Sequence, residues 1–261
     1  MQFYIGTDSV KLAKFIFNFT IPFVSFNTLE YRKSIFCKGI IIDSGSFTRI
    51  KLGREVADYR RLIDTAIIND ARIVFVPDYM CETNIRAIGG YSVETAIRRT
   101  TRNTIDMLKY AEKIGFDTKR IGRVVQGWNV EDYIRHIDLM LKKKVIEDKK
   151  DCVIGIGSVC RRNATLNIVN IIKAIRKRLP NAYLHAFGVK GDTLPYINRL
   201  VDSADSFAWA IGSWHAKRDG RPVCGRFGCE KNCVHCEEAV KIFYDKMIKK
   251  CKYFISNLEI F

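Results

Sequence analysis

The sequence predicts an α/β fold, a TIM-like (β/α)8 barrel, on three observations. Short runs rich in β-branched residues, such as Ile40-Ile41-Ile42, lack polar alternation, and this pattern indicates strands buried on both faces of a parallel sheet. Most of these runs precede a segment with helical periodicity, which is typical of βα units. Eight such runs occur along the chain, which is the number that closes a barrel. An open, doubly wound sheet is the alternative.

The expected strands and helices alternate along the chain. The strands are predicted at Gln2–Ile5, Phe23–Phe26, Gly39–Ile42, Arg72–Asp78, Arg123–Gly127, Cys152–Ile156, Tyr183–Phe187 and Ser206–Ile211. The helices are predicted at Gly53–Asn69, Ser92–Ile114, Val130–Lys143, Ala164–Leu179, Thr193–Val201 and Glu237–Ile255. Ser92 suits the N-cap of its helix, and Gly115 and Pro180 each follow a helix that they would end.

The chain is strongly basic. Lysine and arginine outnumber aspartate and glutamate by 44 to 28 over 261 residues, which gives a formal net charge of +16. This charge indicates a polyanionic partner, with nucleic acid the first candidate and an anionic membrane the second. Because no apolar run reaches about eighteen residues and the N-terminus lacks a signal pattern, we expect no membrane span and no secretion. We therefore expect a cytoplasmic protein, in the host cytoplasm if it is viral.

Polar side chains and glycines follow the expected strands at the points where those strands end. They are Asp43, Asp78, Gln126, Gly157, Ser158, Gly188 and Asp205. Because the carboxyl ends of barrel strands converge on one mouth, we expect these residues to form a ligand site. Helix capping explains one or two such acids, and it could explain Asp43 taken alone, but it does not explain the whole series. A carboxylate with an amide suits the reading of a purine edge, and glycine allows close approach.

Four cysteines and a histidine gather near the C-terminus. Cys224, Cys229, Cys233 and Cys236 are soft ligands at close spacing, which predicts a structural tetrahedral zinc site closed to water. Two disulfides are the alternative, which the scattered arrangement of the other five cysteines disfavours. His235 could replace one cysteine as a ligand. The remaining histidines are isolated in the sequence, and we expect them at the surface or hydrogen-bonded: His136, His185 and His215.

We expect one barrel domain over residues 1–215, followed over residues 216–261 by a zinc-binding segment and a C-terminal helix packed on the barrel. Asp202 lies one turn before Asp205 at the end of a predicted helix, so we assign it a structural or solvated role. Basic residues that follow strand ends can rim the mouth and contact phosphates without reading sequence. They are Arg161, Arg162, Lys217 and Arg218.

Seven features in a fixed order resemble the tRNA-guanine transglycosylase superfamily. They are DSGSF (43–47), PDYMCE (77–82), VVQG (124–127), GIGS (155–158), FGV (187–189), ADSFAW (204–209) and the cysteine cluster that follows. Within the superfamily, VVQGW and GIGSVCRR are similar to the DpdA branch, the DNA transglycosylases that place 7-deazaguanines in phage and bacterial DNA. The cysteine spacing departs from the Cys-x-Cys-x2-Cys and distant His of the tRNA enzymes, which leaves open the four groups that hold the metal.

The resemblance implies a role for each matching position. Asp205 corresponds to the nucleophile that attacks C1′ of the target nucleotide, and Asp43 corresponds to the acid and base that handles protons at the purine. Phe47 falls where an aromatic ring stacks on the base. The positions that read the base edge are Asp78, Gln126, Gly157 and Ser158. Gly188 is expected to bind the substrate because it lies at a strand end and not because of the resemblance. The resemblance also implies a (β/α)8 barrel and a zinc ion that only holds structure.

We therefore expect an enzyme that exchanges guanine in DNA for a 7-deazaguanine base, such as preQ0, through a covalent glycosyl-aspartate. The same chemistry on tRNA is the close alternative. A non-catalytic nucleic-acid-binding relative and a glycosidase that hydrolyses the bond are further alternatives. Action as a homodimer is left open.

Overall fold

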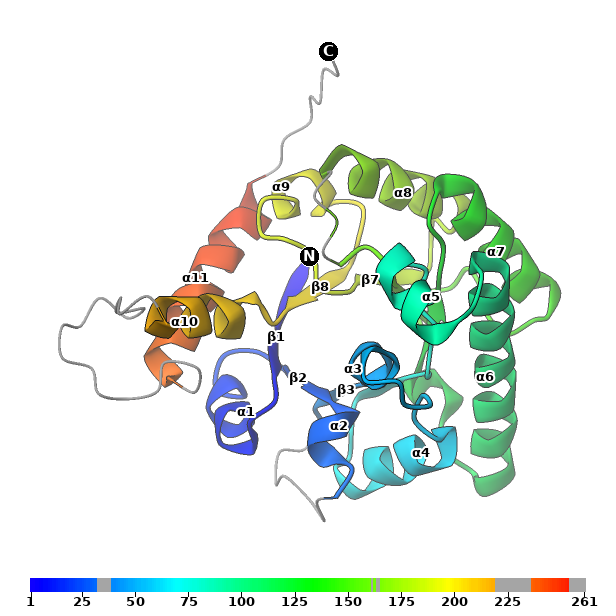
Figure 1. Ribbon diagram of the computed structural model, residues 1–261, viewed down its shortest axis with the longest axis horizontal. Helices are drawn as coiled ribbons and strands as arrows, with labels where there is room; N and C mark the ends of the chain where they lie inside the picture. The colour runs from blue at the N-terminus through cyan, green and yellow to red at the C-terminus, as the bar shows by residue number, and fades with distance from the viewer. Residues whose placement is uncertain (32–38, 161, 163–164, 219–235, 254–261) are drawn as a thin grey trace.

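Eight parallel strands close into a barrel, which confirms the predicted fold class. The structure is a computed structural model that describes residues 1–31, 39–160, 162, 165–218 and 236–253. Each strand pairs with its neighbours in the chain, and β8 pairs with β1 to close the ring (Figure 1). The strands are β1 (Gln2–Thr7), β2 (Pro22–Ser25), β3 (Ile41–Asp43), β4 (Ile73–Phe75), β5 (Ile121–Val125), β6 (Val153–Ile156), β7 (Tyr183–Ala186) and β8 (Ser203–Ser206).

Most of the helices surround the barrel, and a few lie over one of its ends (Figure 1). In the described residues they are α1 (Val10–Ile16), α2 (Phe26–Leu29), α3 (Ser46–Lys51), α4 (Tyr59–Ile68), α5 (Thr83–Gly89), α6 (Val93–Ile114), α7 (Val130–Lys142), α8 (Thr165–Arg178), α9 (Leu194–Ile197), α10 (Ala208–Arg218) and α11 (Glu237–Lys252), with a 3-10 turn at Thr118–Arg120. The predicted N-cap and end of α6 are confirmed. The Ser92 hydroxyl accepts a hydrogen bond from the N–H of Thr95, and Gly115 ends the helix at φ 74°.

The prediction for the eighth strand was wrong. The strand runs over Ser203–Ser206, where it pairs with β1, and the apolar residues after it form α10. A short apolar run cannot be assigned to a strand or a helix by periodicity alone. Here Trp209 and Ala210 are buried from a helix, and the Trp209 indole N–H donates to the carbonyl of Gly6 at 2.8 Å. Asp205 therefore lies inside β8 instead of before it.

Aromatic rings fill the centre of the barrel. Four rings meet there with centroid distances of 4.7–6.1 Å: Phe23, Phe75, His185 and Phe187. Two glycines on β5 and β6 make room for them. A Cβ atom on Gly122 would lie 2.4 Å from the Phe75 ring, and one on Gly155 would lie 2.4 Å from the Phe187 ring. This layer fills the barrel interior, as is typical of TIM barrels, whose ligand sites lie at the carboxyl ends of the strands.

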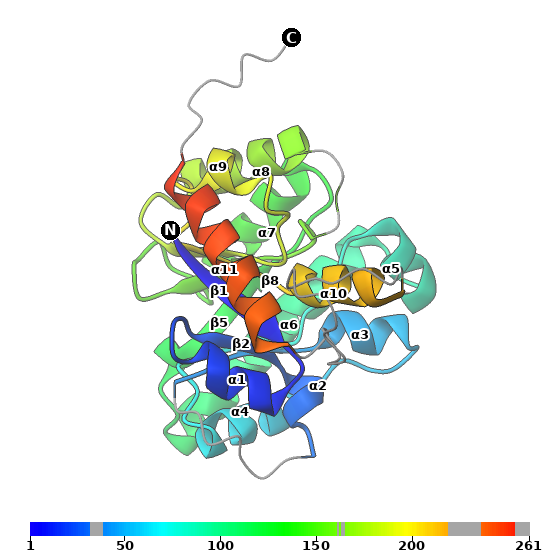
Figure 2. The ribbon, with the colours of Figure 1, turned by 90° about the vertical axis from the view of Figure 1, so that its left-hand side faces the viewer.

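The last helix, α11, lies along β1 and α1 (Figure 2). Phe243 packs on Phe3 and Tyr244 packs on Phe19, with centroid distances of 6.4 and 4.9 Å. The predicted domain boundary between residues 215 and 216 falls inside α10 and stays a prediction. None of the helices in the described ranges is long and apolar enough to cross a lipid bilayer.

Candidate active site

The polar residues predicted at the strand ends come together at one mouth of the barrel. Helices α3, α5 and α10, which follow β3, β4 and β8, gather at this end of the molecule (Figure 2). Burial is the main cause of the raised pKa of Asp43, and the charges of Asp78 and Asp205 raise it further, so both acids lie near Asp43. Residues 43, 78 and 205 are far apart in the sequence, so the fold alone assembles this cluster.

Asp43 ends β3 and begins the turn into α3. Its Oδ2 accepts the backbone N–H of Gly45 at 3.0 Å. Gly45 is the N-cap residue of α3 at φ 70°, and a Cβ atom there would lie 2.4 Å from the Asn27 side chain, so the turn requires glycine. Burial, followed by repulsion from Asp78, raises the pKa of Asp43 to about 7. The carboxyl group can therefore hold or release a proton near neutral pH.

Asp78 follows β4 and is held on both carboxylate oxygens. The Ser44 hydroxyl donates to Oδ1 at 3.1 Å, and Nε2 of Gln126 donates to Oδ2 at 2.5 Å. The backbone N–H of Asp78 donates to Ser46 Oγ at 3.2 Å. Burial raises the pKa of Asp78 to about 6, although the hydrogen bonds from Ser44 and Gln126 counteract this rise. The hydrogen bonds from Ser44 and Gln126 therefore fix the orientation of the Asp78 carboxylate.

Gln126 follows β5 and lies over the glycine turn after β6. A Cβ atom on Gly157 would lie 2.2 Å from Gln126 Nε2, so this glycine makes room for the Gln126 side chain. The predicted contact of Gly157 with the substrate stays a prediction. The carbonyl of Gly157 accepts the hydroxyl proton of Tyr133 at 2.6 Å. Ser158 adopts a left-handed conformation at φ 54°, and its hydroxyl contacts Gln126 Oε1 at 2.6 Å. A strained non-glycine residue of this kind is typical of functional sites.

Asp205 lies on β8 opposite this polar network. Its Oδ1 accepts the backbone N–H of Gly188 at 2.9 Å and lies 3.3 Å from Nε2 of His185. Nδ1 of His185 lies 2.9 Å from the Ser203 hydroxyl, which fixes the ring. Gly188 sits at φ 56°, and a Cβ atom there would lie 2.6 Å from Cys160 Sγ. Among the described residues no hydrogen bond uses Oδ2 of Asp205, so this oxygen is available to a reactant.

A cavity of about 820 Å3 opens beside the acid cluster. Phe47, Trp128 and Arg162 line it, together with Glu82, Thr83, Asn84, Asn129, Val130, Glu131, Cys160 and Asn167. The Arg162 guanidinium lies over the Trp128 ring at 4.2 Å, and it donates to the carbonyls of Ser158 and Trp128 at 2.7 and 2.8 Å. Arg162 therefore ties two mouth loops together while it brings a positive charge to the cavity.

The other predicted phosphate-binding residues are only partly described. Arg161 lies outside the described residues. Lys217 falls in α10, but its side chain lies outside the description, and Arg218 at the end of α10 is exposed. These three positions stay predictions.

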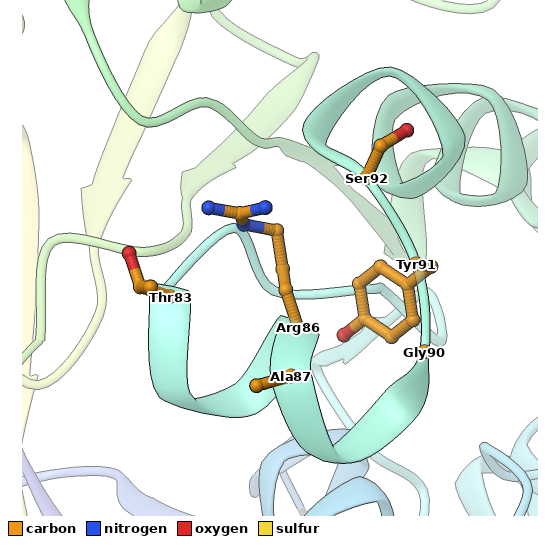
Figure 3. Close-up of a pocket in the computed structure, with 6 residues that line it drawn as sticks. All are labelled: Thr83, Arg86, Ala87, Gly90, Tyr91 and Ser92. Atoms are coloured by element: carbon orange, nitrogen blue, oxygen red, sulfur yellow. The ribbon is translucent and has the colours of Figure 1, made fainter.

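A second cavity of about 460 Å3 lies against α5 (Figure 3). Figure 3 shows the Arg86 side chain extending from α5 between Thr83 and Tyr91. Nε of Arg86 donates to the carbonyl of Cys81 at 3.0 Å. The cavity therefore borders the loop that carries Asp78 and Glu82, and Arg86 holds this loop from outside.

The predicted zinc ligands Cys224, Cys229 and Cys233 lie outside the described residues, as does His235. Cys236 is half-buried and occupies the N-cap position of α11. Within the described ranges no group of three or more His, Cys, Asp or Glu residues has the geometry of a metal site. The zinc site stays a prediction.

Two site residues escaped the sequence reasoning. Glu82 was part of a motif but had no assigned role, yet it is buried and contacts Ser158 Oγ at 2.9 Å. His185 was treated as isolated, yet it contacts Asp205. Only the pairing of β7 with β8 reveals the histidine, because His185 pairs with Ser203 and so shares the inward face of the barrel with Asp205. No sequence signal connects Glu82 with Ser158.

Comparison with known proteins identifies the family of the chain. The family described as DpdA, DeoxyPurine in DNA protein A, matches residues 42–260, which include Asp43, Asp78, Gln126, Ser158 and Asp205. The chain has no match among curated proteins. The family match covers most of the chain and confirms the resemblance predicted from the motifs. The chain belongs to the DpdA family and is a DNA-modifying transglycosylase of the deoxypurine class.

Proposed function

We propose that this protein exchanges guanine in DNA for a 7-deazaguanine base through a covalent intermediate on Asp205. The observation that carries the proposal is the pair of acids at one mouth: Asp205 keeps an available oxygen, and Asp43 is close enough to it for its pKa to be raised. Cleavage and re-formation of an N-glycosidic bond require one carboxylate that stabilises or traps the sugar and a second carboxyl group that transfers protons at the base.

Asp205 acts as the nucleophile. Its Oδ2 attacks C1′ of the target nucleotide, and the electron pair of the C1′–N9 bond passes to the departing guanine. The transition state has oxocarbenium character, which a nearby carboxylate stabilises before the covalent bond forms. The N–H of Gly188 and the His185 ring hold Oδ1 and so aim Oδ2 at the substrate.

Asp43 manages the protons. A group with a pKa of about 7 is partly protonated at neutral pH, so it can protonate the departing guanine as its glycosidic bond breaks. The resulting carboxylate then takes the N9 proton from the incoming 7-deazaguanine. The N9 electron pair of this base attacks C1′, and Asp205 leaves as a free carboxylate. Protons and electron pairs balance over the two half-reactions.

Asp78 and Gln126 read the purine edge. A guanine and a 7-deazaguanine share adjacent N–H donors on the Watson–Crick edge, and an ionised Asp78 offers acceptors to them. Ser44, Gln126 and Ser158 keep this acid in place before the base arrives. Phe47 lines the adjacent cavity, where its ring can stack on the purine.

We assign the cavity of about 820 Å3 beside Phe47 to the nucleotides that flank an extruded base. Its exposed Trp128 offers a stacking surface, and the net charge of +16 favours a polyanion. Reaching C1′ inside a duplex requires the target nucleotide to flip out, which costs a few kcal/mol.

The cysteine cluster is proposed to bind one structural zinc ion. The donor set of four thiols suits tetrahedral zinc, which would hold the segment before α11. We expect about one zinc per chain by metal analysis and less than half of that in Cys229→Ser. Equal zinc content in the parent and the variant would place the metal elsewhere.

The test of the proposed function is a base-exchange assay with labelled guanine in DNA and in tRNA side by side. We expect label release from DNA when a 7-deazaguanine base is supplied, and a covalent protein–DNA adduct that survives denaturation. Release from tRNA alone would favour the tRNA enzyme. Abasic DNA without base replacement would indicate hydrolysis, and binding without release would indicate a non-catalytic relative.

A further inference from the structure

The cavity of about 460 Å3 against α5 contains a hydroxyl group without a hydrogen-bond partner. The side chain of Tyr91 is only 8% exposed, and its Oη is enclosed and has no partner among the described residues. The Tyr91 ring packs closely on α5, where a Cβ atom on Gly89 would lie 2.2 Å from it. A buried hydroxyl that makes no hydrogen bond costs stability, so its presence requires an explanation.

The Tyr91 hydroxyl is a donor that points toward the wall of the cavity formed by Arg86 and Ala87 (Figure 3). Burial, followed by the charge of Asp78, raises the pKa of Tyr91 above its ordinary value, so the phenol keeps its hydrogen at neutral pH. The atom that satisfies this group must therefore be an acceptor. A ligand in the cavity can supply it.

The groups that surround this hydroxyl are positive. Nε of Arg86 donates to the carbonyl of Cys81 at 3.0 Å, and among the described residues neither Nη group of Arg86 makes a hydrogen bond. Arg99, which extends from α6, lies 6.0 Å from the centre of the Tyr91 ring. Ser92, the N-cap residue of α6, also lines the cavity, so the positive end of this 22-residue helix faces it. The cavity therefore suits an anion.

Acidic groups lie near the cavity but do not line it. The six described residues of its wall include one charged side chain, that of Arg86. Asp78 and Glu82 are buried, and Glu94 in the first turn of α6 pairs with Arg135 at 3.4 Å. A guanidinium, a phenol hydrogen and a helix N-terminus together match a phosphate group, which offers negative charge and several acceptor oxygens.

We propose that this cavity binds a phosphate group of the DNA backbone through Arg86, the Tyr91 hydroxyl and the N-terminal end of α6. The inference rests on the proposed function in taking DNA as the ligand. Helix α5 lies at the mouth end of the barrel, which a DNA strand must cross to place a nucleotide beside Asp205 (Figure 2). Because the Tyr91 hydroxyl is enclosed in the free protein, the Arg86 side chain shifts toward the phosphate, and the hydroxyl then donates to the same group.

Thermal unfolding of the ligand-free protein tests whether the hydroxyl lacks a partner. Tyr91→Phe removes a buried donor that has no acceptor, so we expect the melting temperature to rise by about 2–4 °C. The matched control is Tyr244→Phe. The Tyr244 hydroxyl donates to the carbonyl of Phe19 at 3.2 Å, so its removal should lower the melting temperature. A Tyr91→Phe protein that melts below the parent would overturn the proposal.

DNA binding at several salt concentrations tests the ligand. Arg86→Gln should weaken binding about three- to tenfold and reduce the slope of log affinity against log salt by about one, because one phosphate loses its counter-charge. Tyr91→Phe should weaken binding about fivefold and leave the slope unchanged, because it removes a donor but no charge. The double variant should lose less than the product of the two single losses, since both groups contact the same phosphate. Tyr244→Phe should bind as the parent does.

Two results would show that the cavity does not hold the DNA backbone. One is an unchanged DNA affinity in both Arg86→Gln and Tyr91→Phe. The other is stabilisation of the parent, but not of Arg86→Gln, by inorganic phosphate while both variants keep the parent's DNA affinity, which would assign the cavity to a free anion. A parent protein that shows the expected binding losses but exchanges no base would contradict the proposed function and support the phosphate site.

Discussion

The two ends of β8 hold acids with opposite surroundings. Asp202 precedes the strand at the base of the barrel, where Arg176 contacts its Oδ2 at 2.7 Å and Lys150 contacts its Oδ1. Asp205, three residues later, faces the mouth and meets a backbone N–H and a histidine, with no lysine or arginine pairing to it among the described residues. The same residue type is neutralised at one end and left reactive at the other.

The pKa values of the acids follow this difference. Burial alone would raise the pKa of Asp202, but hydrogen bonds from Lys150, Leu184 and Arg176 outweigh it and lower the pKa. At the mouth, burial followed by repulsion from Asp78 raises the pKa of Asp43 to about 7, and burial together with repulsion from Glu82 raises that of Asp78 to about 6. Acids at the base therefore stabilise the fold as carboxylates, whereas acids at the mouth cost stability when they ionise.

The largest expected effect separates the two acids of β8. Asp205→Asn should lower base exchange by at least about a thousandfold and abolish the covalent DNA adduct, because the amide is a poor nucleophile. Asp202→Asn should retain the exchange rate per folded molecule. The measurement is labelled-guanine release with an active fraction determined for each protein. Retention of a tenth or more of the activity in Asp205→Asn would place the nucleophile elsewhere.

The next prediction concerns Asp43, where function and stability should move in opposite directions. Asp43→Asn should lower exchange by about a hundredfold or more, because the proton donor is lost. In the folded parent the pKa of Asp43 is raised to about 7, whereas the unfolded chain has the ordinary value of 3.8. Between these two pH values the folded state keeps a proton that the unfolded state has released. The free energy of unfolding therefore falls as the pH rises toward 7. The variant should therefore be more stable above pH 7, by on the order of 2 kcal/mol.

Thermal unfolding of the parent and of Asp43→Asn over a series of pH values measures how this stability difference depends on pH. The two melting temperatures should converge below about pH 4, where the acid is neutral in both states. A variant that melts below the parent at every pH would show that the Asp43 carboxylate stabilises the fold.

Replacement of Asp202 should change the stability in the opposite direction to replacement of Asp43. Its pKa is lowered in the folded state, so its contribution is present above the unfolded pKa of 3.8 and is lost as pH falls through the folded pKa. Asp202→Asn should cost about 1–3 kcal/mol of unfolding free energy at neutral pH, with a smaller loss in acid. Urea unfolding at two pH values checks this. An equal loss of unfolding free energy at the two pH values would show that the variant loses packing and not a charge interaction.

The smallest effect concerns the positive charges at the two ends. Arg218→Gln, at the mouth end, should weaken DNA binding a few-fold and lower the slope of log affinity against log salt by about one. Arg178→Gln is the matched control, because Arg178 ends α8 at the base and pairs with Asp138 at 2.8 Å. Binding titrations at several salt concentrations provide both slopes. An equal change of this slope in the two variants would show that DNA does not bind preferentially at the mouth.

Much of this site was accessible from local sequence patterns. A buried strand followed by an acid, an amide or a glycine is visible within a few residues, and this pattern indicates Asp43, Asp78 and Gln126. Asp205 was also predicted as a site residue, but directly before its expected strand. The barrel follows from the alternation of such strands with helices. The eighth strand was misplaced because the apolar run after Asp205 fits a helix and a strand equally well until its pairing with β1 is known.

The amino-acid sequence by itself determined the fold class, the family and the acids at the mouth, because these depend on short-range patterns and motif order. The tertiary structure alone decided that Glu82 meets Ser158 and that His185 meets Asp205, since these contacts join residues 76 and 20 positions apart. It also decided that Gly157 makes room for Gln126. Such contacts depend on barrel closure, which brings strand ends together at distances that no local periodicity encodes.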